Sequence, residues 1–406
     1  MLFLFEKIGF HNLYGLVDRI EKWNNDVGGS CHMKRIWIFF LPFILFTLTF
    51  STDLTYGDKS DGIEYKMVIQ TSGHTIYRTE KILQPEITKA IEKANWTSSP
   101  YPPVASDLFI EIVTGDETET LVVSEQGYII DGKRKKIMKE LPFEAKEMLW
   151  EQYKALQKEH YGADISWKDA NQLLPKYSSF TVLDLDSGQS FKVQRRAGSN
   201  HADVQPITID DTKVMKEIYN GTWSWDRRAI IVISDKGRFA ASMHGMPHGA
   251  GALANGFPGH FCIHFNESVT HKSKKMDYAH SIMVKKASGK WLGYTKSLTP
   301  MEMVDAFIIS VNQHDFFILN SLFGKTDREI LKEKEESIEN ILHLKRLSNE
   351  VQLDTSNKLE VNVPVKIHIH MRTGAKSQNI TFRFKRETIF DQWNLDLEHT
   401  LNQIIN

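Results

Sequence analysis

Residues 257–265 read FPGHFCIHF, and from position 260 onward polar and apolar side chains alternate. Alternate side chains of a β-strand share a face, so this stretch predicts a strand with two unlike faces. One face carries two histidines around a cysteine, and the other carries three apolar side chains that need a core. The two sets are His260, Cys262 and His264 on the first face, and Phe261, Ile263 and Phe265 on the second.

The sequence around this strand is rich in histidine and in turn signals. Seven of the sixteen histidines fall between positions 201 and 280. Strands are expected at 229–234 and 238–243, joined by the turn Asp235-Lys236-Gly237. Helices are expected at 207–219, with the pair Asp210-Asp211 as its cap, and at 277–286. Residues 175–325 therefore form a predicted central domain, mostly β.

Two stretches with a different sequence pattern flank this central domain. Residues 63–170 predict an accessory α+β domain with a hairpin at 64–81 and helices at 84–94 and 143–160. Residues 327–406 predict a helix at 327–346, strands at 358–363, 365–371 and 379–385, and a final helix at 391–405. His368 and His370 alternate there with Ile367 and Ile369, as on the polar face of a half-buried strand. The predicted fold class is multidomain α+β, a central mostly-β domain flanked by two small α+β domains.

Length and charge limit the class of protein. A chain of 406 residues is long enough for two to three domains of about 150 residues each. Its 50 Lys and Arg nearly balance its 51 Asp and Glu, for a formal net charge of −1. Dedicated nucleic-acid binders are usually basic, so nucleic acid is not an expected partner.

The N-terminal residues predict export. Lys34-Arg35 precede the apolar stretch 36–50, IWIFFLPFILFTLTF, which is short for a transmembrane helix. Residues 33–57 are therefore expected to be a signal peptide, or an uncleaved membrane anchor. Because signal peptides start close to their charged end, translation is expected to begin at Met33 and residues 1–32 to be a mis-annotated extension. The expected location is extracytoplasmic, secreted to the cell wall or anchored on the outer face of the membrane.

The histidines give Cys262 a possible chemical role. The chain has two cysteines, Cys31 and Cys262, so a disulfide framework is excluded. A histidine beside a thiol accepts its proton, which makes the sulfur a nucleophile. Two other interpretations stay open. In one, Cys262 is a buried apolar side chain. In the other, His244, His260 and His264 are zinc ligands.

The run from His244 to His264 resembles the catalytic signature of the L,D-transpeptidases, the YkuD-type cysteine enzymes of bacterial cell walls. That family has a histidine upstream of Ser/Thr-His-Gly-Cys, then an apolar residue and Arg or Asn. Here fourteen residues separate His244 from the sequence GHFCIH at 259–264. The resemblance covers roughly residues 175–290. Gly259 stands for the Ser/Thr, Phe261 for the Gly and His264 for the Arg/Asn.

The resemblance implies a divergent L,D-transpeptidase-like catalytic domain without a cofactor. On it, Cys262 is the nucleophile, His260 activates it, and His244 lies near the substrate. The substrate class is the peptidoglycan stem peptide, which loses D-alanine to form a thioester on Cys262. A second stem then gives a cross-link, whereas water gives carboxypeptidase or endopeptidase activity.

Further substrate-binding residues are expected near this run. Arg196 can pair with a carboxylate, and Asp203 can orient a histidine, although both also suit a structural turn. Trp225 offers an aromatic surface for sugar or peptide, with core packing as the alternative. The expected binding residues are His264, Arg196, His201, Asp203, Gly259, Phe261, His248 and Trp225.

Two other functions stay open at this point. One is a non-catalytic peptidoglycan-binding or envelope sensor protein, favoured by Phe261 and His264 in place of the family's residues. The other is a zinc-dependent peptidoglycan hydrolase that uses the same histidines.

Overall fold

A computed structural model describes residues 62–71, 75–98, 105–138, 141–270, 274–324, 327–348 and 353–405. The expected extension, signal peptide or anchor at 1–57 lies outside these residues. Within them, no helix is both long enough and apolar enough to cross a membrane. The described chain is a mixed α+β structure, which confirms the coarse fold class.

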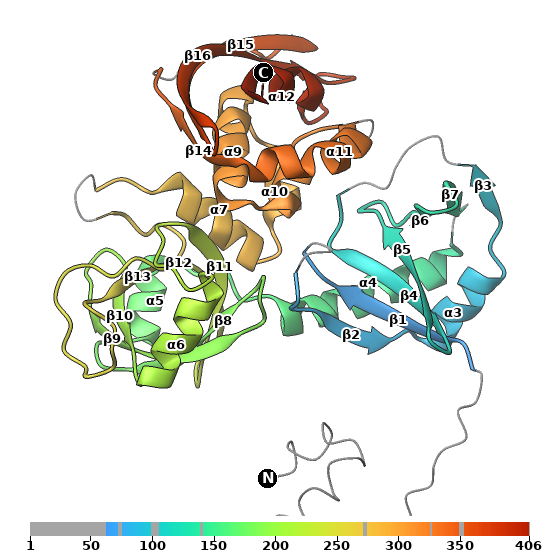
Figure 1. Ribbon diagram of the computed structural model, residues 1–406. Helices are drawn as coiled ribbons and strands as arrows, with labels where there is room; N and C mark the ends of the chain where they lie inside the picture. Colours follow the sequence, from blue (N-terminus) through green and yellow to red (C-terminus); the bar gives the residue numbers. More distant parts are fainter. Residues whose placement is uncertain are drawn as a thin grey trace, which may run out of the picture. The chain divides into compact units, whose positions relative to one another are not determined.

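The first region is an antiparallel sheet of seven strands in the order β2-β1-β4-β5-β6-β7-β3, with two helices (Figure 1). Helix α4 packs on β1 and β2, and its start and end match the predicted helix at 143–160. Its aliphatic side chains, with those of α3, close the core over the sheet. The elements are β1 (Glu64–Ile69), β2 (Thr79–Ile82), α3 (Pro85–Glu92), β3 (Trp96–Ser98), β4 (Leu108–Thr114), β5 (Glu117–Val123), β6 (Ile129–Asp131), β7 (Lys136–Met138) and α4 (Phe143–His160).

The second region is a closed six-stranded barrel in the order β10-β13-β12-β11-β8-β9. Apolar side chains fill its interior, and helices α5 and α6 add Ala170 and Met215 to that core. Helix α6 begins with a capping box between Thr208 and Asp211, so Asp211 acts from the first turn rather than as the cap. The elements are α5 (Trp167–Leu173), β8 (Ser179–Asp184), β9 (Ser190–Ala197), β10 (Ala202–Pro206), α6 (Ile209–Ile218), β11 (Arg227–Ser234), β12 (Gly237–His244) and β13 (Phe261–His264).

Four helices follow the barrel strands, and α7 packs against β11 and β12 (Figure 1). Outward-facing apolar side chains of the barrel share a core with these helices and with the last sheet. The long apolar stretch from position 299 breaks into two helices where His314 adopts the left-handed conformation. The helices are α7 (Tyr278–Ala287), α8 (Trp291–Thr295), α9 (Pro300–Gln313) and α10 (Phe316–Asn320).

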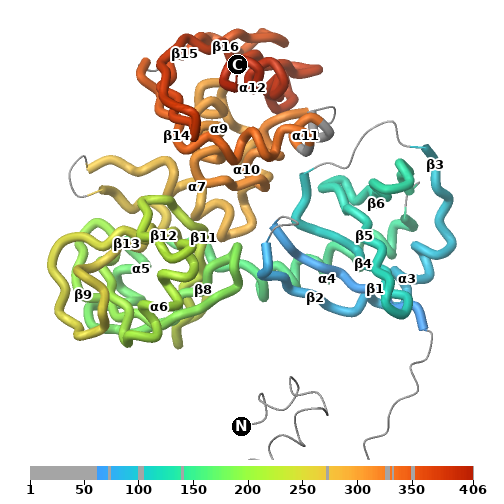
Figure 2. The backbone as a smooth tube through the Cα atoms, viewed as in Figure 1, coloured from blue at the N-terminus to red at the C-terminus, as the bar shows by residue number. Residues whose placement is uncertain are grey.

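The last region is an antiparallel sheet in the order β14-β15-β16-β17. Helix α9 lies against β14, and helix α12 lies against β16 (Figure 2). The strands predicted at 358–363 and 365–371 form one strand, because Pro364 lies beyond the part of β15 that pairs with β14. The elements are α11 (Asp327–Glu339), β14 (Ile341–Arg346), β15 (Glu360–Met371), β16 (Gly374–Lys385), β17 (Asn394–Leu395) and α12 (Leu397–Ile405).

The predicted helix at 327–346 is wrong in its last third. Helix α11 ends at Glu339, and residues Ile341–Arg346 form strand β14. Ile341 and Leu344 are buried, and the backbone of this segment pairs with β15. The charged residues of this segment are spaced like those of an exposed helix. Its pairing with a strand more than twenty residues further along the chain decides the structure instead.

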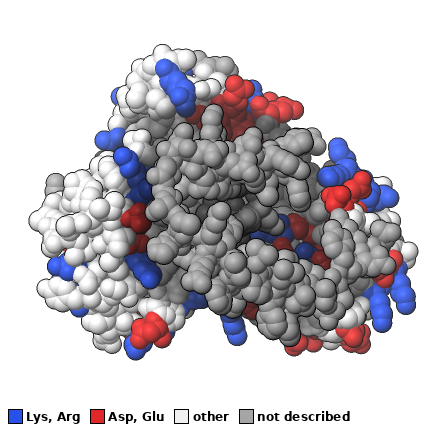
Figure 3. Space-filling model, turned by 60° about the horizontal axis from the view of Figure 1, so that its bottom comes forward, with Lys and Arg blue, Asp and Glu red and all other residues white. Residues whose placement is uncertain are grey.

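Charged side chains of both signs occur close together on the face shown in Figure 3, among the described residues in view. This agrees with the near balance of 50 basic and 51 acidic residues in the chain.

Candidate functional site

The register of β10, β13 and β12 builds the site. Asp203 pairs with Cys262 across β10 and β13, and His264 pairs with Ser242 across β13 and β12. The same register, continued by one residue pair in each ladder, gives two rows of side chains across the three strands. Asp203, Cys262 and His244 form one row, and His201, His264 and Ser242 the other. All six residues are buried.

The opposite face of β13 belongs to the barrel interior. Phe261 and Ile263 are fully buried in the barrel core. The Phe261 ring packs against Phe191 and Phe257, with centroids 6.2 and 5.8 Å apart. Phe261, which we expected among the substrate-binding residues, is therefore a core side chain that points away from Cys262.

Cys262 has both a nitrogen and a carboxylate oxygen beside its sulfur. Its Sγ lies 3.3 Å from Nε2 of His248 and 3.8 Å from Oδ1 of Asp203. The side chain is only 4% exposed. Burial raises the pKa of the Cys262 thiol, and the neighbouring carboxylate of Asp203 raises it further. The thiol is thus held protonated, and it reacts as a nucleophile only if a base removes its proton.

A pair of backbone hydrogen bonds holds His248 at the sulfur. The amides of His248 and His260 each donate to the other residue's carbonyl at 2.9 Å. Gly259 has φ +121°, and a Cβ there would lie 2.5 Å from the His248 carbonyl oxygen. Glycine at 259 therefore allows this close approach. The Nδ1 of His260 contacts the carbonyl of Ala250 at 3.1 Å, so the imidazole placed against Sγ is that of His248.

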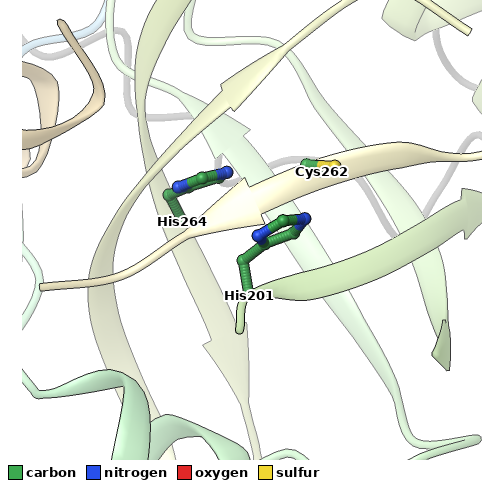
Figure 4. A group of neighbouring side chains, drawn as sticks. All are labelled: His201, Cys262 and His264. Atoms are coloured by element: carbon green, nitrogen blue, oxygen red, sulfur yellow. The ribbon is translucent and has the colours of Figure 1, made fainter. Parts of the chain in front are cut away.

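His201, just before β10, comes together with Cys262 and His264 of the adjacent strand β13 (Figure 4). The rings of His201 and His264 are stacked with centroids 4.4 Å apart. Nδ1 of His201 lies 2.8 Å from the Val269 carbonyl, and its Nε2 lies 3.3 Å from Oδ1 of Asp203. Since a carbonyl only accepts hydrogen bonds, Nδ1 of His201 carries a proton. Asp203 thus contacts His201 as well as the thiol.

His280 of α7 covers this cluster. Its ring is parallel to that of His264 at 3.9 Å, and its Nδ1 lies 2.8 Å from Oγ of Ser242. Burial, helped by the nearby His264 and Arg227, lowers the pKa of His280 well below the usual value, so the ring is neutral. His280 is only 3% exposed, so it belongs to the buried cluster.

His244 lies at the other side of the thiol, beside Trp225. The centroid of its ring is 4.7 Å from that of Trp225 and 5.2 Å from that of His248. Burial lowers the pKa of His244 to about 3, and the neighbouring His248 and Arg227 add to the effect. Its Nδ1 is buried without a hydrogen-bond partner among the described residues. Trp225 itself is half-exposed, so it forms part of the surface beside the site.

Arg195 and Arg196, which precede His201 in the sequence, differ in burial and in their contacts. Arg195 is buried and donates to the carbonyls of Leu174 and Gly198, which fixes the turn leading to His201. Arg196, which we expected to bind substrate, stacks on the ring of Tyr177 at 5.1 Å. The structure places Arg196 with Tyr177 on the barrel surface and not among the histidines around Cys262.

Two groups of side chains have the composition and spacing of metal ligands. The ligand atoms of His201, Cys262 and His264 lie within 4.8 Å of one another, and so do those of His244, His248 and Cys262. Both groups share Cys262. Of the zinc ligands that the sequence suggested, His244 and His264 belong to these groups, and His260 belongs to neither.

Sequence reasoning missed Ser242 and His280. Ser242 precedes His244 by two positions on one strand, so strand alternation places both on the same face. His280 approaches from a helix that begins after the cap residue Asp277, and no local pattern connects it with β13.

No family model matches the chain. A search of curated proteins gives no match either. The similarity to the L,D-transpeptidases therefore rests on the residues from His244 to His264.

Proposed function

We propose that this protein is an exported acyl-transfer or hydrolytic enzyme of the cell wall, in which Cys262 is the nucleophile and His248 its base. The 3.3 Å contact between Cys262 Sγ and His248 Nε2 carries the proposal. This distance is within reach of direct proton transfer. A histidine so placed can activate a thiol that its surroundings keep protonated.

The reaction begins with the thiol proton. Nε2 of His248 takes this proton while Sγ bonds to the carbonyl carbon that precedes the leaving D-alanine. The carbon–nitrogen bond breaks, His248 gives the proton to the departing amine, and a thioester remains on Cys262. An amine of a second stem peptide, or water, then attacks the thioester and regenerates the thiol. The resemblance assigned the activating role to His260, whereas the geometry favours His248.

The substrate class rests on two further observations. Lys34-Arg35 and the apolar stretch 36–50 have the pattern of an export signal, and the run from His244 to His264 resembles the L,D-transpeptidase signature. At the site, His248 is half-buried and Trp225 is 49% exposed. The two rings lie 5.6 Å apart. They offer an aromatic surface to a peptide that approaches the sulfur from this side.

The test is D-alanine release from a disaccharide-tetrapeptide by the full chain, with intact-mass detection of the thioester. Cys262→Ala should abolish both. His248→Gln should lower the rate by about 100-fold or more, the usual share of a general base. His260→Gln should have a much smaller effect. His368→Gln, on a different sheet, should leave the rate unchanged.

Two results would contradict this assignment. Full turnover by Cys262→Ala would exclude the cysteine mechanism. A large loss in His260→Gln with little loss in His248→Gln would return the activating role to His260. The products distinguish the outcomes of the second half-reaction, because a cross-linked dimer requires an amine acceptor and a free tripeptide requires water.

A further inference from the structure

We infer that His201, Cys262 and His264 form a binding site for a thiophilic divalent cation, with Zn²⁺ as its probe, and that the bound ion withdraws Cys262 from catalysis. The binding site stands on its own geometry. Its effect on catalysis rests on the proposed function.

The first argument is the geometry of the ligand atoms. A tetrahedral zinc ion takes nitrogen at about 2.0–2.1 Å and thiolate sulfur at about 2.3 Å, which puts neighbouring ligand atoms roughly 3.3–3.8 Å apart. The ligand atoms of His201, Cys262 and His264 lie within 4.8 Å of one another. A bound ion would draw these atoms closer through rotation about the side-chain torsions. Three protein ligands leave a fourth position for water or for a further side chain.

The second argument is that the backbone holds these ligands in place. Cys262 and His264 are two residues apart on β13, so they share a face of the strand (Figure 4). The pairing of Ala202 with Ile263 sets His201 across from His264. All three side chains are buried. A site fixed by strand pairing loses little side-chain freedom when an ion binds.

The third argument is the support of His201. Its Nδ1 donates to the carbonyl of Val269 at 2.8 Å, which directs Nε2 toward Asp203 and the sulfur. A backbone carbonyl on the outer nitrogen is one of the usual partners of a metal-binding imidazole, because it fixes both the tautomer and the ring orientation. A thiolate at Cys262 and the carboxylate of Asp203 together supply two negative charges, which balance a divalent cation.

The shared cysteine connects the ion to catalysis. Metal binding converts the thiol to a thiolate and uses its lone pair in the metal–sulfur bond. His248 can then no longer take a proton from Sγ, and the sulfur no longer attacks a carbonyl. The metal-free protein is therefore the active form, and the zinc-bound protein is the inactive form.

The second group, His244, His248 and Cys262, also has suitable spacing. We assign the ion to the first group because both of its histidines are buried and flank the ladder between β10 and β13. His248 instead lies between strands and is half-buried. The two assignments give different results in a variant that changes His264 alone.

The experiment uses the full chain after treatment with a chelator, titrated with Zn²⁺ alone. Bound zinc is measured by calorimetry and elemental analysis, and Co²⁺ absorption reports the thiolate bond. We expect one ion per chain. His264→Gln should weaken binding by more than the roughly 10–100-fold that loss of an outer partner costs. The matched control His370→Gln, an exposed histidine of β15, should bind like the wild type.

The effect of zinc on Cys262 can also be measured without turnover, as the reactivity of the thiol. Zinc should protect Cys262 from iodoacetamide in the wild type and not in His264→Gln, with peptide mapping to separate Cys262 from Cys31. Zinc should also stop D-alanine release by the wild type, and a chelator should restore it.

Three results would overturn the inference: no binding of one ion per chain, unchanged binding in His264→Gln, or faster D-alanine release with zinc. Failure of the proposed function looks different. The metal-free wild type would then release no D-alanine, while zinc binding and the Co²⁺–thiolate absorption would remain, together with their loss in His264→Gln.

Discussion

Strands β13 and β15 have the same sequence pattern but present different surfaces. In each, an isoleucine stands between two polar or ionisable side chains, as CIH at 262–264 and HIH at 368–370. In both, the aliphatic face is fully buried, with Ile263 and Ile369 at 0% exposure. The polar faces differ, because His264 is 3% exposed whereas His370 is exposed.

The difference comes from what covers the second face. Over β13 lie His280 of α7 and His248 of the segment after β12. On β15, Nδ1 of His368 contacts the exposed Ser377 on the neighbouring strand at 2.9 Å. An alternating histidine pattern thus predicts a strand in either case. It produces a reactive cluster only where distant elements exclude water from the polar face.

The largest expected effect tests the buried face of the sheet, which is alike in the two regions. Phe261→Ala in the barrel and Phe382→Ala in β16 each remove a fully buried ring. Each should cost about 3–5 kcal/mol of unfolding free energy, the usual range for such truncations. Urea unfolding, with separate transitions fitted separately, measures the cost. A loss below about 1 kcal/mol for Phe261→Ala would mean that this ring does not fill the barrel core.

The next effect is a loss of stability at acid pH, which should be larger for the covered face of β13 than for the exposed face of β15. His244 has its pKa lowered to about 3, first by burial and then by the neighbouring His248 and Arg227. In the unfolded chain its pKa returns to about 6.5. Below that pH the unfolded state takes up a proton that the folded state refuses. The stability contributed by neutral His244 is therefore present above about pH 6.5 and is lost as the pH falls toward 3.

His244 alone should account for a loss of about 2 kcal/mol between pH 7 and pH 5. His244→Gln should flatten the curve of unfolding free energy against pH by that amount in the presence of chelator. The control His370→Gln, on the exposed face, should keep the wild-type slope. Equal slopes for the wild type and His244→Gln would show that His244 does not titrate in this manner.

The sequence contains enough information for the strands and for one part of the site. Alternation from Phe261 to His264 follows directly from the two-residue period of a strand, and α4 was predicted to the residue because its apolar spacing is helical. The same period does not reveal which face is covered. That depends on α7, whose His280 comes from outside the strand.

The contact between Cys262 and His248 was out of reach of sequence reasoning for a similar reason. Fourteen positions separate the two residues, and their approach depends on the backbone pairing of His248 with His260. His260, only two residues before the cysteine, was the simpler partner to choose. Strand β14 was missed because its pairing with β15 is also a long-range contact.

The smallest effect comes from two serines that make the same hydrogen bond in the two regions. Oγ of Ser242 lies 2.8 Å from Nδ1 of buried His280, and Oγ of Ser377 lies 2.9 Å from Nδ1 of His368 at the surface. Ser242→Ala leaves a buried ring nitrogen without its partner, which should cost about 1–3 kcal/mol. Ser377→Ala leaves a nitrogen that water reaches, so the cost should stay within about 0.5 kcal/mol.

Comparing Ser242→Ala with Ser377→Ala isolates the effect of excluding water, because the substitution, the hydrogen bond and the partner atom are the same in both. Chemical denaturation of both variants at neutral pH, with chelator present, gives the two costs directly. A clear excess for Ser242→Ala would support exclusion of water as the source of the difference between β13 and β15. Equal costs would mean that water reaches His280, and the covered face would then resemble the exposed one.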